Sequence, residues 1–364
     1  MIEFAFEPLR SLGLTPSLAR EAALLCRDSD IPEPFLARLL EVHRETVRID
    51  DGLHDEGVEQ SARIVPALAR AGELAVGDWL LCASDEHGAC WVRARIPPHS
   101  HIARRDADGR RHPVVSNVDC ALLVMGLDDD FNLRRLERYL ALVHGSGVDP
   151  VVVLSKADVV ATQPDLLEQR IDEVRRRVGM HVEVLALDGT AATSADALAH
   201  HLSPGRTLVM LGSSGAGKST LTNTLLGAAV QDTGAVREHD SRGKHTTTSR
   251  SLHRLPGGAC VIDTPGLRTL RPDVDAVTLG ASFADIDELA GRCRFRDCRH
   301  TGEPGCAVRA GVDADRVGNY QKMLRESRRG MATPQERRAQ LSVWKARTKA
   351  ARARGKGRGG DANE

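Results

Sequence analysis

Residues 212–220 read GSSGAGKST, a glycine followed after four intervening residues by Gly-Lys-Ser, which is the phosphate-binding loop pattern. The apolar run TLVML at 207–211 predicts a buried strand before this loop, and residues 219–227 predict a helix after it. In such a loop backbone N–H groups point at phosphate oxygens, and the helix N-terminus adds the positive end of its dipole. A glycine-rich turn without a ligand is the alternative. We expect a nucleoside triphosphate to bind at Gly212, Ser213, Ser214, Gly215, Ala216, Gly217, Lys218, Ser219 and Thr220.

Further groups are expected to surround the phosphates. Lys218 would reach the outer phosphates and stabilise their charge during the reaction, and Ser219 is the hydroxyl expected on Mg²⁺. Residues 260–266 read CVIDTPG, a buried strand followed by a turn. Asp263 would hold the Mg²⁺ shell through water, and the Gly266 N–H would meet the γ-phosphate.

The segment that selects the base follows the apolar run at 149–154 and consists of Ser155, Lys156, Ala157 and Asp158. Guanine offers an N1–H and an exocyclic amine side by side, and the Asp158 carboxylate can accept both hydrogen bonds. The Lys156 stem can lie across the base while its ammonium reaches the phosphate-binding loop. Most GTPases have Asn where this chain has Ser155, and the shorter side chain predicts looser guanine binding. The pattern indicates a site for GTP and GDP.

The polar segment 243–248, GKHTTT, lies between the phosphate-binding loop and the DTPG turn. One of its threonines is expected to contact Mg²⁺ and the γ-phosphate, and we choose Thr247. Leu267 follows Gly266 where many GTPases have a glutamine that orients water. Either a partner completes catalysis, or another residue does, and His245 is the nearest candidate. A flexible polar loop is the alternative interpretation of this segment.

The base-binding segment precedes the phosphate-binding loop, whereas in ordinary GTPases it follows the loop. Apolar runs at 117–126, 149–154 and 181–187 alternate with helical patterns at 133–144, 165–178 and 195–202. This alternation predicts a parallel sheet covered on both sides. Because domain termini lie close together, a chain can be cut and rejoined elsewhere without loss of its site. We therefore expect a circularly permuted α/β P-loop GTPase domain at 114–275.

Cysteine and histidine cluster near the C-terminus as Cys293-x4-Cys298-x-His300-x5-Cys306. Three thiolates and one imidazole make a closed tetrahedral site, so we expect one structural Zn²⁺ with no position left for catalysis. A redox pair or buried thiols are the alternatives. Arginines interleaved with these ligands give a basic surface that suits a phosphate backbone. We expect a C-terminal α-helical zinc-binding domain at 276–330, with a basic helix at 320–329.

Short alternating runs separated by turn residues extend from 41 to 113. They predict a small antiparallel β-barrel of the oligonucleotide-binding (OB) type. Trp79 and Trp91 either stack on bases or fill its core, and the aromatic content of only 3% favours the core. Residues 1–40 are expected to form an N-terminal extension with one short helix.

The length of 364 residues suits two or three domains, and the formal net charge is zero. The charge is segregated, because residues 321–364 contain thirteen Lys or Arg against four Asp or Glu. The basic tail at 331–364 favours an anionic partner such as nucleic acid, with a solvated disordered tail as the alternative. No run approaches the roughly 18 apolar residues that span a bilayer. We expect a cytoplasmic monomer without membrane contact.

The barrel, the permuted motifs SKAD, GSSGAGKST, KHTTT and DTPGL, and the cysteine-histidine knuckle together resemble the small-ribosomal-subunit-dependent GTPase A family of bacteria. The stretches VGDW at 76–79, NVD at 117–119 and YQKML at 320–324 are also similar to that family. The resemblance covers residues 41–329. It implies GTP hydrolysis stimulated by the small ribosomal subunit, late in the maturation of that subunit. It also implies that the barrel and the zinc domain contact ribosomal RNA.

Two other functions remain open on the residues alone. The chain could be a GTP-gated RNA-binding module with little hydrolysis of its own, or a small-molecule kinase that uses the same loop. A kinase would leave the SKAD and DTPG segments without a role, which disfavours it.

Overall fold

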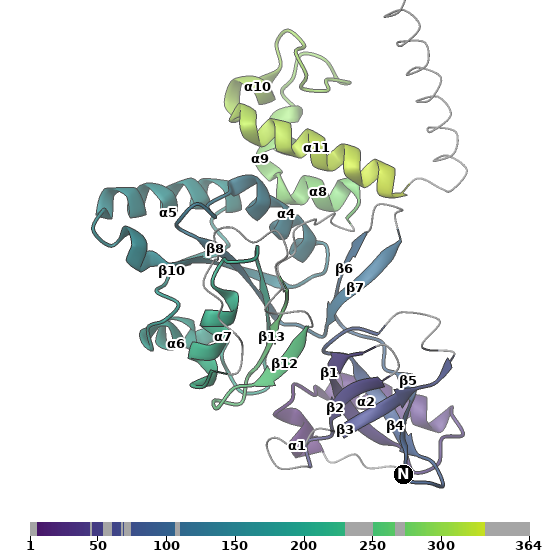
Figure 1. Cartoon of the computed structure of the whole chain (residues 1–364). Coiled ribbons are helices and arrows are strands. Elements are labelled where there is room, and N and C mark those ends of the chain that lie inside the picture. The colour runs from purple at the N-terminus through teal and green to yellow at the C-terminus, as the bar shows by residue number, and fades with distance from the viewer. Residues whose placement is uncertain are drawn as a thin grey trace, which may run out of the picture.

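The computed structural model describes residues 6–43, 46–53, 60–66, 68, 74–105, 110–229, 250–265 and 274–331. Three parts follow one another along the chain, namely a barrel, an α/β domain and a helical region (Figure 1). The barrel and the helical region lie on different sides of the α/β domain, and a two-stranded hairpin stands between them (Figure 1). Among the described helices, none has the length and apolar character that a bilayer crossing requires.

Five strands form the N-terminal barrel, which closes in the order β1-β2-β3-β5-β4. All neighbouring pairs are antiparallel except β3 and β5, which are parallel. The prediction of a barrel is confirmed. The prediction that all its strand pairs are antiparallel is wrong, because a closed ring with an odd number of strands cannot alternate in direction throughout. The strands are β1 Phe35–Val42, β2 Thr46–Asp50, β3 Gln60–Ile64, β4 Trp79–Ser84 and β5 Cys90–Arg95.

The barrel starts at Phe35, before the expected residue 41, and two helices precede it. These are α1, Phe6–Arg10, and α2, Pro16–Arg27, whose N-terminus is capped by the Thr15 side chain. Five consecutive residues of β1 are buried, so this strand lacks the alternation that marks a half-buried strand. Trp79 is fully buried in the barrel core and Trp91 is half-buried, so the core assignment holds for Trp79.

A six-stranded sheet forms the centre of the α/β domain, in the order β10-β9-β8-β11-β13-β12. The first five strands are parallel, as the sequence predicts, and the edge strand β12 is antiparallel to β13. The strands are β8 Cys120–Gly126, β9 Asp149–Ser155, β10 Glu183–Ala186, β11 Thr207–Leu211, β12 Ser251–Arg254 and β13 Cys260–Asp263.

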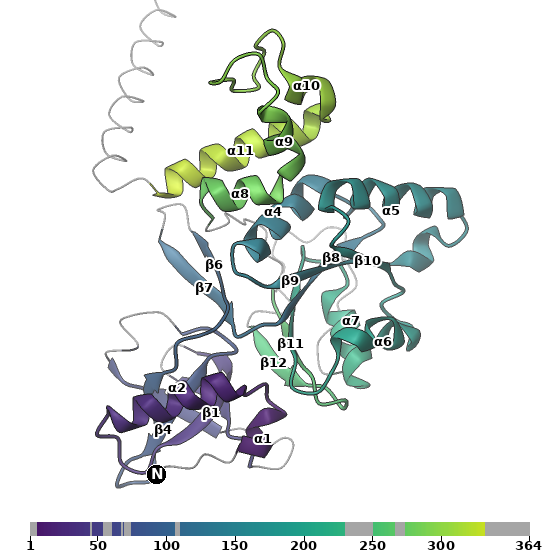
Figure 2. The same cartoon turned by 180° about the vertical axis from the view of Figure 1, so that it is seen from behind.

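Helices cover both faces of this sheet (Figures 1 and 2). Leu123 and Met125 of β8 face the core shared with α4 and α5, while Leu122 and Val124 face the core shared with α6 and α7. This alternation within a continuous apolar run is what a strand buried on both faces requires. The helices are α4 Leu133–His144, α5 Pro164–Val178, α6 Thr193–Leu198 and α7 Lys218–Leu226, with the short 3₁₀ turns η1 Ala157–Val160 and η2 Ala199–His201.

A buried arginine joins the barrel to the α/β domain. The Arg38 guanidinium, on β1, donates to the carbonyl oxygens of Leu12 and Asn117, each at 2.9 Å. It also donates to Thr207 Oγ1 at 3.3 Å. Asn117 has a φ of 52°, and its Nδ2 donates to the Gly77 carbonyl oxygen at 3.0 Å. The NVD and VGDW stretches therefore meet at this joint, where they hold two domains together.

Within residues 274–331, four helices form a C-terminal region that lies against the α/β domain (Figure 2). Its core contains Leu279, Phe283, Ile286 and Val308, and Ala141 of α4 belongs to the same cluster. The hairpin of β6, His101–Arg105, and β7, Arg111–Ser116, stands beside it. The helices are α8 Ala276–Ser282, α9 Ala284–Ala290, α10 Ala307–Gly311 and α11 Ala314–Met331.

Candidate nucleotide site and metal centre

The phosphate-binding loop leaves the sheet at the end of β11 and enters α7, as predicted. Gly215 and Gly217 have φ values of 83° and 87°, in the left-handed region that favours glycine. A Cβ at Gly212 would lie 2.4 Å from a carbonyl oxygen of β8, so only glycine fits there. The Lys218 ammonium donates to the Ser213 carbonyl oxygen at 2.7 Å. The lysine therefore already lies across the loop that would hold the phosphates.

Ser219 and Asp263, the two predicted groups of the Mg²⁺ shell, come together from α7 and β13. Ser219 Oγ donates to Asp263 Oδ2 at 3.1 Å. Asp263 Oδ1 is buried and has no hydrogen-bond partner among the described residues. Burial raises the pKa of Asp263, although the nearby Lys218 ammonium opposes this, and burial lowers the pKa of Lys218. The Asp263 carboxylate and the Ser219 hydroxyl are hard oxygen donors of the kind that Mg²⁺ prefers.

Ser155 joins the base-binding segment to the phosphate-binding loop. It is buried at the end of β9, and its Oγ donates to the Ala216 carbonyl oxygen at 2.7 Å. Lys156 has a φ of 60°, and its ammonium pairs with Asp128 Oδ2 at 2.6 Å. The expected contact of this ammonium with the phosphate-binding loop is therefore replaced by an ion pair with the turn after β8.

Asp158, the predicted guanine-binding residue, lies in η1 and is exposed. The neighbouring Ala157 N–H donates to the Leu187 carbonyl oxygen at 3.1 Å. The Leu187 N–H in turn donates to the Leu154 carbonyl oxygen at 2.8 Å. The base-binding segment thus rests on the chain that follows β10, and the Asp158 carboxylate remains open to a base arriving from solvent.

Three predicted site residues, His245, Thr247 and Gly266, lie outside the described residues. The part of the site that the structure describes contains the phosphate-binding loop, the base-binding segment and Asp263. The roles of His245 in orienting water, of Thr247 in binding Mg²⁺ and of Gly266 in binding the γ-phosphate therefore stay predictions.

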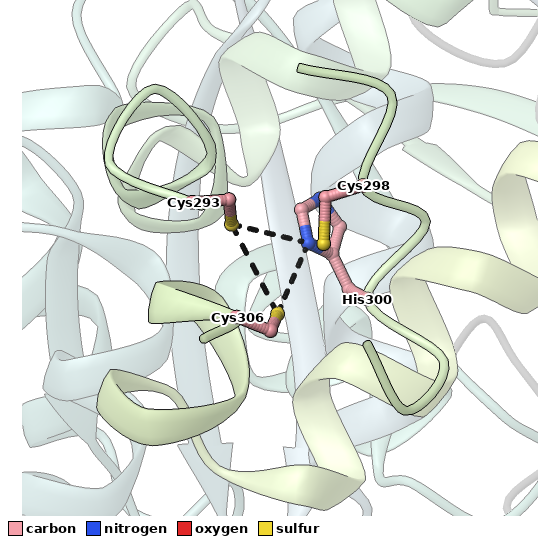
Figure 3. A group of neighbouring side chains, drawn as sticks. All are labelled: Cys293, Cys298, His300 and Cys306. Atoms are coloured by element: carbon pink, nitrogen blue, oxygen red, sulfur yellow. Dashed lines mark hydrogen bonds between the residues drawn. The ribbon is translucent and has the colours of Figure 1, made fainter. Parts of the chain in front are cut away.

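The four predicted zinc ligands, Cys293, Cys298, His300 and Cys306, come together with their ligand atoms within 4.8 Å of one another. Cys293 Sγ lies 3.9 Å from Cys306 Sγ, and His300 Nδ1 lies 3.7 Å and 3.4 Å from these two sulfurs (Figure 3). Tetrahedral zinc with Zn–S bonds of about 2.3 Å places its sulfurs about 3.8 Å apart. The spacing and the donor set therefore fit a single zinc ion.

Glu303 shapes the loop between the predicted zinc ligands and was not identified from the sequence. Its carboxylate accepts hydrogen bonds from the N–H groups of Arg299, Thr301 and Gly302, at 3.1, 2.8 and 3.1 Å. Hydrogen bonds from its own N–H and from these neighbours lower the pKa of Glu303 to about 2. A glutamate in a glycine-containing loop between metal ligands is the only signal that could have predicted this role.

An ion-pair network joins α4 to the C-terminal helices and was not predicted from the sequence. The Glu137 side chain is 1% exposed and accepts from Arg316 at 2.7 Å and from Arg177 at 2.9 Å. Asn319 also donates to Glu137, and Arg316 forms a second pair with Asp285 at 2.7 Å. Because these partners come from α5, α9 and α11, no local pattern could indicate them.

Fold and site together define a circularly permuted P-loop GTPase with a Cys₃His cluster in its C-terminal region. The sequence model of the RsgA GTPase family matches residues 96–272. The chain belongs to the RsgA GTPase family, and it is a GTP hydrolase, as predicted. The small ribosomal subunit biogenesis GTPase RsgA of Xanthomonas oryzae pv. oryzae strain PXO99A is 42% identical over 330 residues, which cover 87% of this chain and 88% of that relative. RsgA of Xanthomonas campestris pv. campestris strain B100 is 43% identical over 303 residues, 80% of each chain.

Two solved structures share the fold. YjeQ from Thermotoga maritima superposes with a TM-score of 0.57 at 22% identity, over 81% of this chain and 98% of that one. YloQ, described as a circularly permuted GTPase, gives a TM-score of 0.52 at 22% identity, over 82% of this chain and 96% of that one. Both likenesses concern the fold alone, and they agree with the permuted order of strands.

Proposed function

We propose that this chain binds the small ribosomal subunit and hydrolyses GTP to GDP during the late maturation of that subunit, in the cytoplasm and as a monomer. The proposal rests on the 42% identity, over 87% of the chain, to a small ribosomal subunit biogenesis GTPase. The permuted nucleotide site and the Cys₃His cluster in this same chain support it.

Both ends of the molecule offer groups that suit ribosomal RNA. On the barrel, the guanidinium groups of Arg63 and Arg93 lie 5.6 Å and 5.9 Å from the centre of the half-buried Trp91 ring. In the zinc-binding region, Arg294 lies 5.6 Å from the centre of Phe295, which is 41% exposed. Such pairs present a charge for phosphates together with an aromatic face for bases. We infer that the barrel and the zinc-binding region contact RNA.

We assign a separate role to each residue of the nucleotide site. Lys218 stabilises charge on the outer phosphates, and Asp158 selects guanine. Ser219 and Asp263 hold Mg²⁺, together with Thr247. When bound, Mg²⁺ would neutralise the charge of the phosphates. We assign the orientation of the attacking water to His245 or to a group of the ribosomal partner, because Leu267 occupies the usual position of glutamine.

One structural Zn²⁺ is proposed for the cluster of Cys293, Cys298, His300 and Cys306. Four protein ligands complete a tetrahedron, so a zinc ion here would fix the fold and take no part in the reaction.

GTP turnover should increase by about 100-fold or more when small ribosomal subunits are added, because a positioned general base or water-orienting group typically contributes about 10²–10⁴-fold. The measurement is phosphate release by the purified protein alone, with small subunits, and with large subunits as the control. Equal turnover in all three samples would contradict the proposed partner.

The Asp158→Asn variant should lose GDP affinity by about 10- to 100-fold, the cost of removing hydrogen bonds to a charged acceptor. It should gain affinity for xanthosine diphosphate, because an amide N–H can donate to the carbonyl that xanthine has in place of the guanine amine. Fluorescence competition with both nucleotides measures this change. Asp165→Asn, at an exposed position of α5, is the matched control. Unchanged GDP binding by the Asp158 variant would remove the base assignment.

A further inference from the structure

The short turn after β8, residues 127–131, lies between the two nucleotide-binding loops. Strand β8 pairs with β9 on one side and with β11 on the other, and all three are parallel. Their carboxyl ends therefore meet at one edge of the sheet, where β9 continues into the base-binding segment and β11 into the phosphate-binding loop. The turn is placed to contact both loops at once.

Two carboxylates of this turn make those contacts. Asp128 Oδ2 accepts from the Lys156 ammonium of the base-binding segment at 2.6 Å. Asp130 Oδ1 accepts from the Ser213 hydroxyl of the phosphate-binding loop. Arg135, in the first turn of α4, donates to the same Asp130 oxygen at 2.6 Å. Each loop is thus held by its own aspartate, and only Asp129 separates the two aspartates in the chain.

The turn itself is fixed in shape, so the two aspartates are linked rigidly. The Asp130 N–H donates to Asp128 Oδ1 at 3.2 Å, and the Gly126 N–H donates to Asp130 Oδ2 at 3.2 Å. A Cβ at Gly126 would lie 2.3 Å from Asp128 Oδ1, so the close approach of this carboxylate requires glycine. A displacement of one loop would therefore be passed to the other through the turn.

We propose that Asp128 and Asp130 are positioning residues that couple guanine recognition to phosphate binding. The proposal rests on the proposed guanine site at Asp158. In the chain, the base-binding segment and the phosphate-binding loop are separated by α5, β10, α6 and β11, so contacts across the sheet edge set their relative position. Ser155 supplies one such contact, directly to Ala216, and the two aspartates supply the others. Asp128 orients Lys156 over the base, and Asp130 holds the phosphate-binding loop at Ser213.

The test compares GDP with inosine diphosphate, which lacks the exocyclic amine of guanine. Binding of both nucleotides is measured by fluorescence competition for Asp128→Ala, Asp130→Ala and the exposed neighbour Asp129→Ala. We expect Asp128→Ala to reduce the preference for GDP over inosine diphosphate by about 10-fold, the effect of one charge-assisted hydrogen bond. Asp130→Ala should weaken both nucleotides by about 10-fold and leave their ratio unchanged. Asp129→Ala should change neither.

A double-mutant cycle separates positioning from a general loss of structure. Asp130→Ala and Ser213→Ala should be non-additive, because both remove the same hydrogen bond. Asp130→Asn, which keeps an acceptor for Ser213, should recover most of the affinity. Equal losses from all three aspartate variants, or additive effects in the cycle, would overturn the proposal. If Asp158→Asn also fails to change base preference, the guanine assignment is at fault, whereas the effect of Asp130 on both nucleotides would still stand.

Discussion

Replacing Glu137 with alanine should lower the free energy of unfolding by about 3–5 kcal/mol, the typical cost of removing one partner from a buried ion pair. The loss is large because Arg316 cannot turn to water. Its guanidinium lies 4.6 Å from the centre of the buried Phe283 ring and is held on its other edge by Asp285. Arg177 would lose the same acceptor. The contact between α4 and α11 should therefore loosen first.

Urea unfolding followed by circular dichroism measures this loss, and limited proteolysis shows whether the C-terminal helices detach. Glu288→Ala is the matched control, because Glu288 pairs with Arg292 at 2.6 Å but both side chains are about two-thirds exposed, at 69% and 65%. That exposed pair should contribute at most about 0.5 kcal/mol. If the two variants lose the same free energy of unfolding, the Glu137 network stabilises the protein no more than an exposed ion pair does.

The parts of the fold that follow from short segments of sequence were predicted well. The strand at 207–211 and the helix after it match β11 and α7, because an apolar run and a glycine-rich turn leave few other conformations. The four predicted zinc ligands lie close together, as their spacing predicts. In each case the residues that decide the structure lie within about fifteen positions of one another, so a local pattern can contain the information.

The missed features depend on residues that are far apart in the chain. Strand β1 is buried along most of its length, so its apolar run does not distinguish a strand from a helix. Strand β12 has four residues and takes its place only by pairing with β13. The partners of Lys156 and Glu137 lie on other elements, and Asp128 gave no sign that it would replace the phosphate-binding loop as the partner of Lys156. Such contacts follow from the topology and not from periodicity.

Removing the proposed zinc should unfold the C-terminal helices while nucleotide binding persists. Structural zinc sites contribute about 10–16 kcal/mol in small zinc-binding peptides, which is as large as the whole stability of a typical domain, about 5–15 kcal/mol. In this chain Cys306 is both a proposed zinc ligand and the N-cap of α10, where its Sγ accepts from the Arg309 N–H at 3.5 Å. Loss of the metal would therefore also release the start of that helix.

Nucleotide binding should survive because no described contact joins the cluster to the two nucleotide loops, and α4 retains its packing on the sheet through Leu136, Leu140 and Val143. Zinc content by mass spectrometry, helicity by circular dichroism and binding of a fluorescent GDP analogue can be followed on one sample during chelation. Cys298→Ser should reproduce the loss of helicity, and Cys26→Ser, on α2, should not. If GDP binding and helicity disappear together, the network at Glu137 makes the two domains a single folding unit. If both persist without the metal, the buried core of Leu279, Phe283 and Ile286 is enough to hold these helices.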